Sequence, residues 1–116
     1  MMGYYSTVFF ACDRDQHELI LAATEMEPDE VHSQETSDNK EIFCCEWNAV
    51  KWGYYSQADK FEDLLRDVKP EKDDRFNGIE IYPFGFVRIG EEDDDVEYIG
   101  DPYEFGIHYI RSLEWI

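Results

Sequence analysis

The pattern of apolar and polar residues along the chain predicts alternating strands and helices in its first half. Residues 4–11 (YYSTVFFA) are rich in aromatic and β-branched side chains without strict alternation, which predicts a central strand covered on both faces. Apolar residues then recur at helical spacing. A helix is therefore expected from a cap at Asp13 or Asp15 to about Met26, and Pro28 ends it.

Polar and apolar segments continue to alternate in the middle of the chain. Residues 27–40 are polar and aperiodic, which indicates a mobile loop, whereas residues 41–47 (EIFCCEW) indicate a second strand. Ser56 is expected to cap a helix over residues 57–68, because the apolar positions there follow i, i+3, i+4, i+7 spacing. Residues 69–75 are expected to form a charged connector.

The last third of the chain predicts strands alone. Residues 79–89 are expected to form one bent strand or two short ones, since Pro83 removes a ladder donor. A strand is predicted over residues 96–99 and another over the alternating residues 104–111, with Trp115 docked on the body of the protein. The element order is then β-α-β-α-β-β-β. It predicts a single α+β domain with an antiparallel or mixed sheet of about four to five strands and two helices packed on one face.

Charge changes this picture more than any motif does. The 116 residues include 28 Asp and Glu against 10 Lys and Arg, so the net charge is −18. Chains this acidic are often disordered, but 43% hydrophobic and 16% aromatic residues are enough to form a core. The excess of acids predicts a strongly basic partner protein. It disfavours direct binding of nucleic acid or of an anionic membrane, because both need clustered Lys and Arg.

Cysteine usage and the start of the chain indicate a cytoplasmic protein. Cys12, Cys44 and Cys45 form no C-x-x-C pair and no disulfide framework, so they are expected to be small buried apolar residues. The chain opens without a basic segment followed by an apolar stretch, and no apolar run approaches the ~20 residues that span a bilayer.

The first group of candidate partner-binding residues lies on the helix expected over residues 57–68. Asp59, Asp63 and Asp67 follow i, i+4, i+8 spacing opposite the apolar stripe. Carboxylates about 6 Å apart along a helix are able to imitate a row of backbone phosphates. The alternative is an ordinary solvated helix face, because Lys60 and Arg66 lie nearby.

The second group surrounds the predicted turn before the strand at residues 96–99. It consists of Glu91, Glu92, Asp93, Asp94, Asp95, Glu97 and Asp101. Acid runs of this kind often belong to interaction surfaces, and at a hairpin tip they steer a basic partner toward the protein. A solubilising loop and a Ca²⁺ site are the alternatives, although the run lacks the D-x-[DN]-x-[DN]-G spacing of an EF-hand loop.

Catalysis has little support in the sequence. The chain has no nucleophile elbow, P-loop or zinc-ligand spacing, and its three histidines are scattered. We therefore expect neither an enzyme nor a cofactor. A small metal-dependent enzyme that uses the acids as ligands stays open as an alternative.

Several segments resemble a family of small, acidic, mostly uncharacterised bacteriophage proteins. They are GYYSTV (residues 3–8), Trp47 with VKW (residues 50–52), and FVRIGEE (residues 86–92) followed by DDVE (residues 94–97). The resemblance implies a phage gene product that acts in the host cytoplasm, and it implies no catalytic residues. In size and acidity the chain also resembles the DNA-mimicking anti-restriction and anti-CRISPR inhibitors.

Together these observations favour a phage-encoded inhibitor that presents the acids around the predicted turn, supported by those of the helix stripe, to a basic groove of a nucleic-acid-binding defence protein. An immunity protein or antitoxin that neutralises a basic nuclease toxin is the alternative, because the same electrostatics would serve it.

Overall fold

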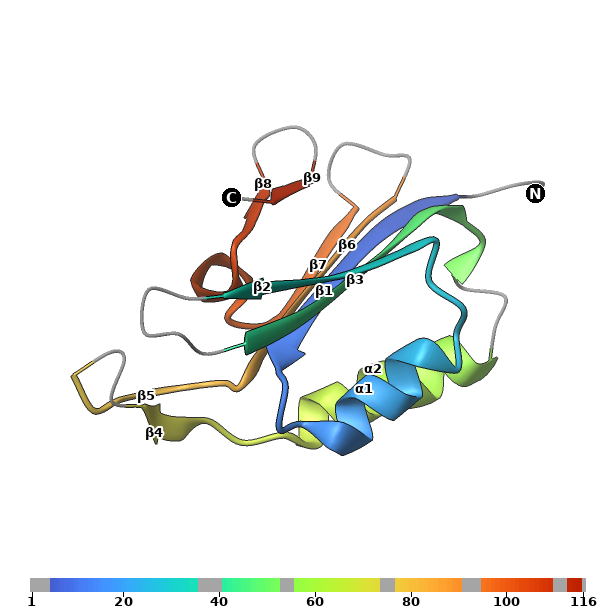
Figure 1. Cartoon of the computed structure of the whole chain (residues 1–116). Helices are drawn as coiled ribbons and strands as arrows, with labels where there is room; N and C mark the ends of the chain where they lie inside the picture. Colours follow the sequence, from blue (N-terminus) through green and yellow to red (C-terminus); the bar gives the residue numbers. More distant parts are fainter. Residues whose placement is uncertain are drawn as a thin grey trace.

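The computed structural model of the protein describes residues 5–35, 41–52, 56–73, 77–90, 95–109 and 113–115. Helices and strands alternate within these residues much as the pattern predicts (Figure 1). In chain order the elements are β1 (Ser6–Asp13), α1 (His17–Thr24), β2 (Glu30–Glu35), β3 (Glu41–Val50), α2 (Ser56–Asp67), β4 (Glu71–Asp73), β5 (Ile79–Ile81), β6 (Phe84–Ile89), β7 (Val96–Gly100), the 3₁₀ helix η3 (Pro102–Phe105), β8 (Ile107–Tyr109) and β9 (Leu113–Trp115).

The main sheet of the described chain has five strands in the order β2-β3-β1-β6-β7, and every neighbouring pair is antiparallel. The helices α1 and α2 lie side by side against one face of this sheet (Figure 1). The expected α+β fold is thereby confirmed. Two further pairs, β4 with β5 and β8 with β9, form separate two-stranded sheets.

Strand β1 is the centre of the sheet, as its apolar run at residues 8–12 predicts. Val8 and Phe10 contribute to the core beneath the helices, whereas Phe9 and Ala11 contribute to a second core on the other face. All four side chains are at most 5% exposed. Successive residues of a strand point to opposite faces, so the buried middle of such a strand has a continuous apolar run instead of an alternating pattern.

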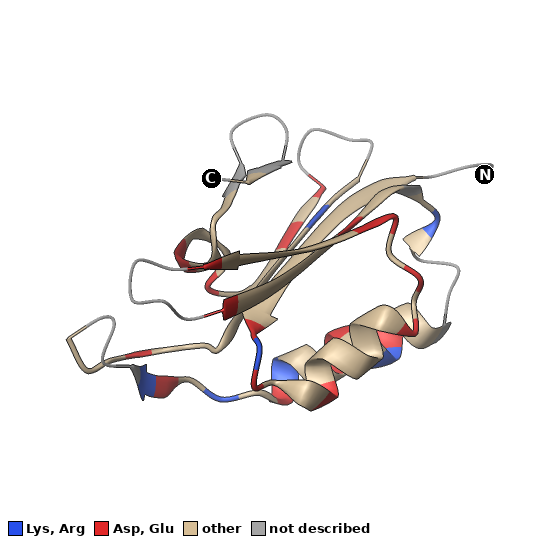
Figure 2. Cartoon of the chain, in the orientation of Figure 1, with Lys and Arg blue, Asp and Glu red and all other residues tan. Residues whose placement is uncertain are grey.

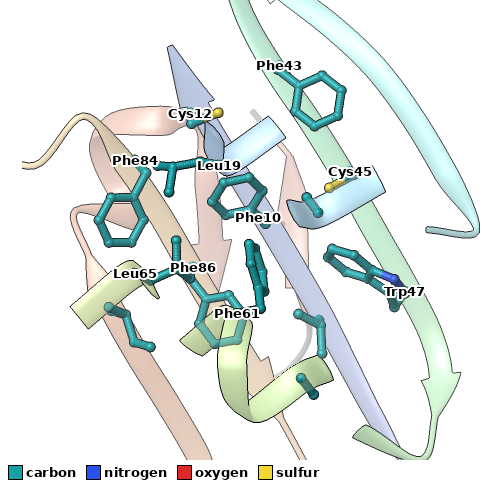
Figure 3. Packing of buried hydrophobic residues seen from close by; sticks show 14 of the residues in the cluster. Phe10, Cys12, Leu19, Phe43, Cys45, Trp47, Phe61, Leu65, Phe84 and Phe86 are labelled. Carbon is teal, nitrogen blue, oxygen red and sulfur yellow. The ribbon is translucent and has the colours of Figure 1, made fainter. Parts of the chain in front are cut away.

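The helix-side core is largely aromatic (Figure 3). Phe61 of α2 meets Phe10 of β1 edge to face, with 5.1 Å between ring centroids, and Trp47 of β3 meets Trp52 in the same way at 5.2 Å. Such ring pairs contribute about 0.5–1.5 kcal/mol each beyond the area that they bury. The apolar residues whose spacing predicted α2 are therefore the residues that pack this helix against the sheet.

The opposite face of the sheet is covered by the C-terminal segment. Phe105 of η3 and Ile107 of β8 are buried against this face, and Trp115 of β9 stacks on Phe9 with 4.6 Å between ring centroids. Docking of Trp115 is thus confirmed. The single strand predicted over residues 104–111 is wrong, because the segment begins in η3 and passes through Gly106 at a φ of +85° before β8.

Two segments predicted as irregular contain strands. The polar loop predicted at residues 27–40 includes β2, and the charged connector predicted at residues 69–75 includes β4. β2 lies at the edge of the main sheet, and both strands have mostly exposed side chains. Backbone pairing holds such strands in place, so their sequences carry no hydrophobic period.

The bounds of α1 also differ from prediction. Asp13 is the last residue of β1 and Asp15 lies in the following turn, so neither caps the helix; Gln16 takes the cap position without a side-chain hydrogen bond. The helix ends at Thr24, two residues earlier than expected. The helix predicted over residues 57–68 is confirmed within one residue at each end. The segment 79–89 forms two strands, β5 and β6, separated at Pro83.

Candidate acidic interface

The predicted acidic stripe occupies the exposed face of α2. Asp59, Asp63 and Asp67 are all exposed, while the opposite face of the helix buries Phe61 and Leu65. Their Cα atoms follow one another at about 6 Å along the helix axis. The structure therefore presents these three carboxylates on one exposed face of a regular, core-anchored helix.

Basic residues neutralise this stripe only in part. The Arg66 guanidinium lies 3.9 Å from a carboxylate oxygen of Asp63, but its closer partners are elsewhere. Its Nη2 lies 3.0 Å from Glu62 Oε1 and 3.0 Å from Glu97 Oε1. Within the described part of the chain, Asp59 and Asp67 form no ion pair. Two of the three carboxylates are thus available to a partner.

A buried carboxylate on α2 ties this helix to the sheet. Glu62 is 6% exposed, and its Oε2 accepts a hydrogen bond from Trp52 Nε1 at 2.6 Å. Arg88 of β6 brings its Nε to 3.4 Å from the same oxygen. Hydrogen bonding to Glu97 raises the pKa of Arg66 above its usual value, and Glu62 adds to this effect. The network fixes the exposed face of α2 relative to β6 and β7.

The second predicted group of acids, around the turn before β7, is only partly covered by the structure. Residues 91–94 lie outside the described residues, which resume at Asp95. The backbone N–H of Gly90 donates to the carbonyl oxygen of Asp95 at 2.8 Å, which closes the ends of the acid run. β6 and β7 pair on the sheet side of this closure, so the expected hairpin is confirmed.

Glu97 and Asp101 have internal partners that the sequence did not reveal. Glu97 of β7 pairs with Arg66 of α2, and an Asp101 carboxylate oxygen accepts a hydrogen bond from the backbone N–H of Tyr82 at 2.7 Å. These two carboxylates therefore hold parts of the fold together and also contribute to the negative charge of the surface. Arg66 lies between Asp63 and Glu97, so the two acid groups predicted separately meet where α2 packs on β7.

A groove that sequence reasoning missed lies at the N-terminal end of α2, where the connection from α1 to β2 meets β3. Its volume is about 580 Å³. Glu25, Glu27 and Asp29 line it, and Figure 2 shows acidic residues recurring along this connection. The register between β1 and β3 shifts near this end of β3. Such a bulge leaves a backbone donor without a ladder partner. The N–H of Asn48 accordingly donates to Asp29 Oδ2 at 2.6 Å.

The three cysteines are not activated as nucleophiles. Burial raises the pKa of the Cys44 thiol to about 12, and it raises the pKa values of Cys12 and Cys45 well above the usual range. All three cysteines are free and buried, as the sequence predicts. A thiolate is the reactive form of cysteine, and these sites strongly disfavour it. Among the described residues, no three His, Cys, Asp or Glu side chains gather in an arrangement able to hold a metal ion.

Comparison with known proteins identifies no relative of this chain. No protein family model matches the chain, and neither the curated proteins nor the solved structures compared with it give a match. In the part of the chain that the structure describes, no helix is long and apolar enough to cross a membrane.

Proposed function

We propose that the protein is a phage-encoded inhibitor of a bacterial defence system that binds a basic, nucleic-acid-binding surface of its target in the host cytoplasm. The carboxylate row of Asp59, Asp63 and Asp67 on an anchored helix, in a chain of net charge −18, carries this proposal. A rigid row of carboxylates offers a basic groove the charge pattern that it is built to recognise. The resemblance to small phage proteins supports the origin.

The mechanism that follows is competition for one site. The inhibitor approaches quickly, because opposite charges on two proteins raise the rate of encounter. Its α2 face then occupies the groove that nucleic acid needs. The buried contacts of Glu62 hold α2 in one orientation, so little conformational entropy is lost on binding. The acid run at residues 91–95, which precedes β7 in the chain, adds further negative charge.

The test is capture from bacterial lysate on the tagged protein at about 50 mM and about 500 mM NaCl. These concentrations span Debye lengths from above ~10 Å to a few Å. The wild-type protein is expected to retain one dominant nucleic-acid-binding protein at low salt and to lose it at high salt. Added duplex DNA or RNA is expected to compete for the captured protein.

Two variants of equal charge make this test specific. The stripe variant combines Asp59→Asn, Asp63→Asn and Asp67→Asn, and the control variant removes three exposed carboxylates elsewhere, with Glu18→Gln, Glu71→Gln and Glu104→Gln. Capture is expected to fall at least tenfold for the stripe variant and to change little for the control. Equal losses in the two variants, or capture indifferent to salt, would overturn the proposal. A captured nuclease toxin would favour the immunity-protein alternative.

A further inference from the structure

The groove at the N-terminal end of α2 combines apolar walls with a ring of carboxylates. Tyr5, Met26, Trp47 and Val50 supply apolar surface. Among the described lining residues, Glu25, Glu27 and Asp29 supply three negative charges, whereas Lys51 supplies one positive charge. A concave site with apolar walls and a few convergent charges is the usual form of a ligand site.

The groove is built by contacts between segments that are far apart in the sequence. Trp47 Nε1 donates to the carbonyl oxygen of Met26 at 3.0 Å, and the N–H of Asp29 donates to the carbonyl oxygen of Glu46 at 2.9 Å. Together with the bond from Asn48 to Asp29, these contacts hold the acidic connection against β3. The carboxylates are therefore carried on a fixed backbone.

One side of the groove already lies close to a cation. The Lys51 ammonium group lies 5.5 Å from the centroid of the Tyr5 ring, a distance at which the ring face attracts positive charge. Gln57, in the first turn of α2, also lines the groove, and Asp59 of the acidic stripe follows two residues later. The groove and the stripe thus share the N-terminal end of α2, although residues two apart in a helix lie on different sides of it.

We propose that this groove receives an arginine side chain of the basic partner, and this proposal rests on the proposed function. The aliphatic stem of arginine would lie along Met26 and Val50, and the guanidinium would reach the carboxylates of Glu25 and Glu27. Arginine suits such a site better than lysine, because its planar fork donates to two carboxylates at once and stacks on aromatic faces.

The test is a titration of the ¹⁵N-labelled protein with N-acetyl-arginine amide, followed by NMR. The three tryptophans give three indole N–H signals, and each reports a different site. Trp47 lines the groove, Trp52 donates to Glu62 in the core, and Trp115 donates to Glu46 on the opposite face of the sheet. The Trp47 signal is expected to shift with saturation, while the other two stay in place. N-acetyl-citrulline amide, which is neutral and nearly the same shape, is expected to shift none of them.

Charge-changing variants sharpen the result. Glu25→Gln and Glu27→Gln are each expected to weaken binding of the arginine probe roughly two- to fivefold, the range for exposed ion pairs. Lys51→Gln is expected to strengthen it, because it removes a competing positive charge from the groove. Glu71→Gln, exposed on the separate β4–β5 sheet, is the matched control and is expected to leave binding unchanged. The Trp52 and Trp115 signals show in each variant whether the fold is intact.

The outcomes separate the groove from the proposed function. Equal shifts with the arginine and citrulline probes, shifts spread over all three indoles, or no shift at all would each overturn the arginine site. Such a result would leave the salt-sensitive capture through the α2 stripe untouched. A shift confined to Trp47 and weakened in the Glu25 and Glu27 variants would support the site even if the stripe variant captured its target normally.

Discussion

At the scale of single residues, Glu30 and Glu46 face each other across β2 and β3. A hydrogen bond between the two side chains, with the repulsion of the second charge, raises the pKa of Glu30 above its usual value. Trp115 Nε1 donates to Glu46 Oε2 at 2.9 Å, and the His32 ring meets the Trp115 ring edge to face. Protonated Glu30 therefore stabilises the folded protein. This stabilisation is fully present below the pKa that Glu30 has in the unfolded chain. It is lost as the pH rises through the higher pKa that Glu30 has in the folded protein.

Glu30→Gln is expected to raise the midpoint of thermal unfolding at pH 7, because it removes the repulsion of Glu46. The gain is expected to vanish near pH 4, where Glu30 is protonated in the wild-type protein. Thermal unfolding followed by circular dichroism at both pH values measures this difference. Removing any acid relieves some repulsion in so acidic a chain, so Glu71→Gln, which lies opposite Ile81, is the control. Equal gains for the two variants at pH 7 would contradict the prediction.

At the scale of elements, α2 is held to the sheet by two kinds of contact. Phe61 and Leu65 pack into the core, and Glu62 joins the helix to Trp52, Arg88 and, through Arg66, to β7. A buried carboxylate without partners would cost several kcal/mol, so these contacts decide whether α2 sits correctly. The period of the helix predicted the apolar half of this arrangement. The polar half includes one local pair, Glu62 with Arg66, but its other contacts join residues 10 to 31 positions apart and leave no local signal.

Glu62→Gln is expected to lower the free energy of unfolding by about 2 kcal/mol, because it weakens the bonds to both arginines and leaves their charges less compensated. Urea denaturation measures this loss. Asp63→Asn makes the same charge change one residue later, where the side chain is 78% exposed, and is expected to change stability by less than about 0.5 kcal/mol. Similar losses for the two variants would contradict a special role for Glu62.

At the scale of the whole molecule, charge and core oppose each other. Cores on both faces of one sheet stabilise the chain, while the 28 acidic residues repel one another across its surface. Some of these acids, such as Glu97 and Asp101, bind groups within the protein itself. The stripe on α2 and the carboxylates of the groove are exposed, and their negative charge is the part that a partner meets.

Salt is expected to stabilise this protein. Raising NaCl from about 50 mM to about 500 mM is expected to increase the midpoint of thermal unfolding by several degrees, because screening weakens the self-repulsion. The stripe variant and its control of equal charge are both expected to melt higher at low salt and to gain less from added salt. A large difference between them would show that the stripe repulsion is local rather than a property of the net charge. Unchanged midpoints would contradict the prediction.

Part of the candidate site was predictable from sequence. The positions of Asp59, Asp63 and Asp67 follow from one helical period, and that period is local information. The partners of Glu97 and Asp101 were not predictable, because Arg66 and Tyr82 lie far from them in the sequence. The groove was missed for the same reason: Tyr5, Glu27, Val50 and Gln57 come from four separate segments. Acids between residues 25 and 29 were visible, but nothing in them indicated apolar walls.

The sequence by itself determined the properties that depend on composition or on one local period: the charge of −18, the buried central strand and the amphipathic helix α2. Tertiary structure decided what depends on distant partners. Backbone pairing made strands of the polar segments β2 and β4, and a second apolar face drew the C-terminal segment over Phe9. Almost every residue has the same backbone donor and acceptor, whatever its side chain. A polar segment therefore becomes a strand only when a neighbouring strand supplies the partners for its backbone hydrogen bonds.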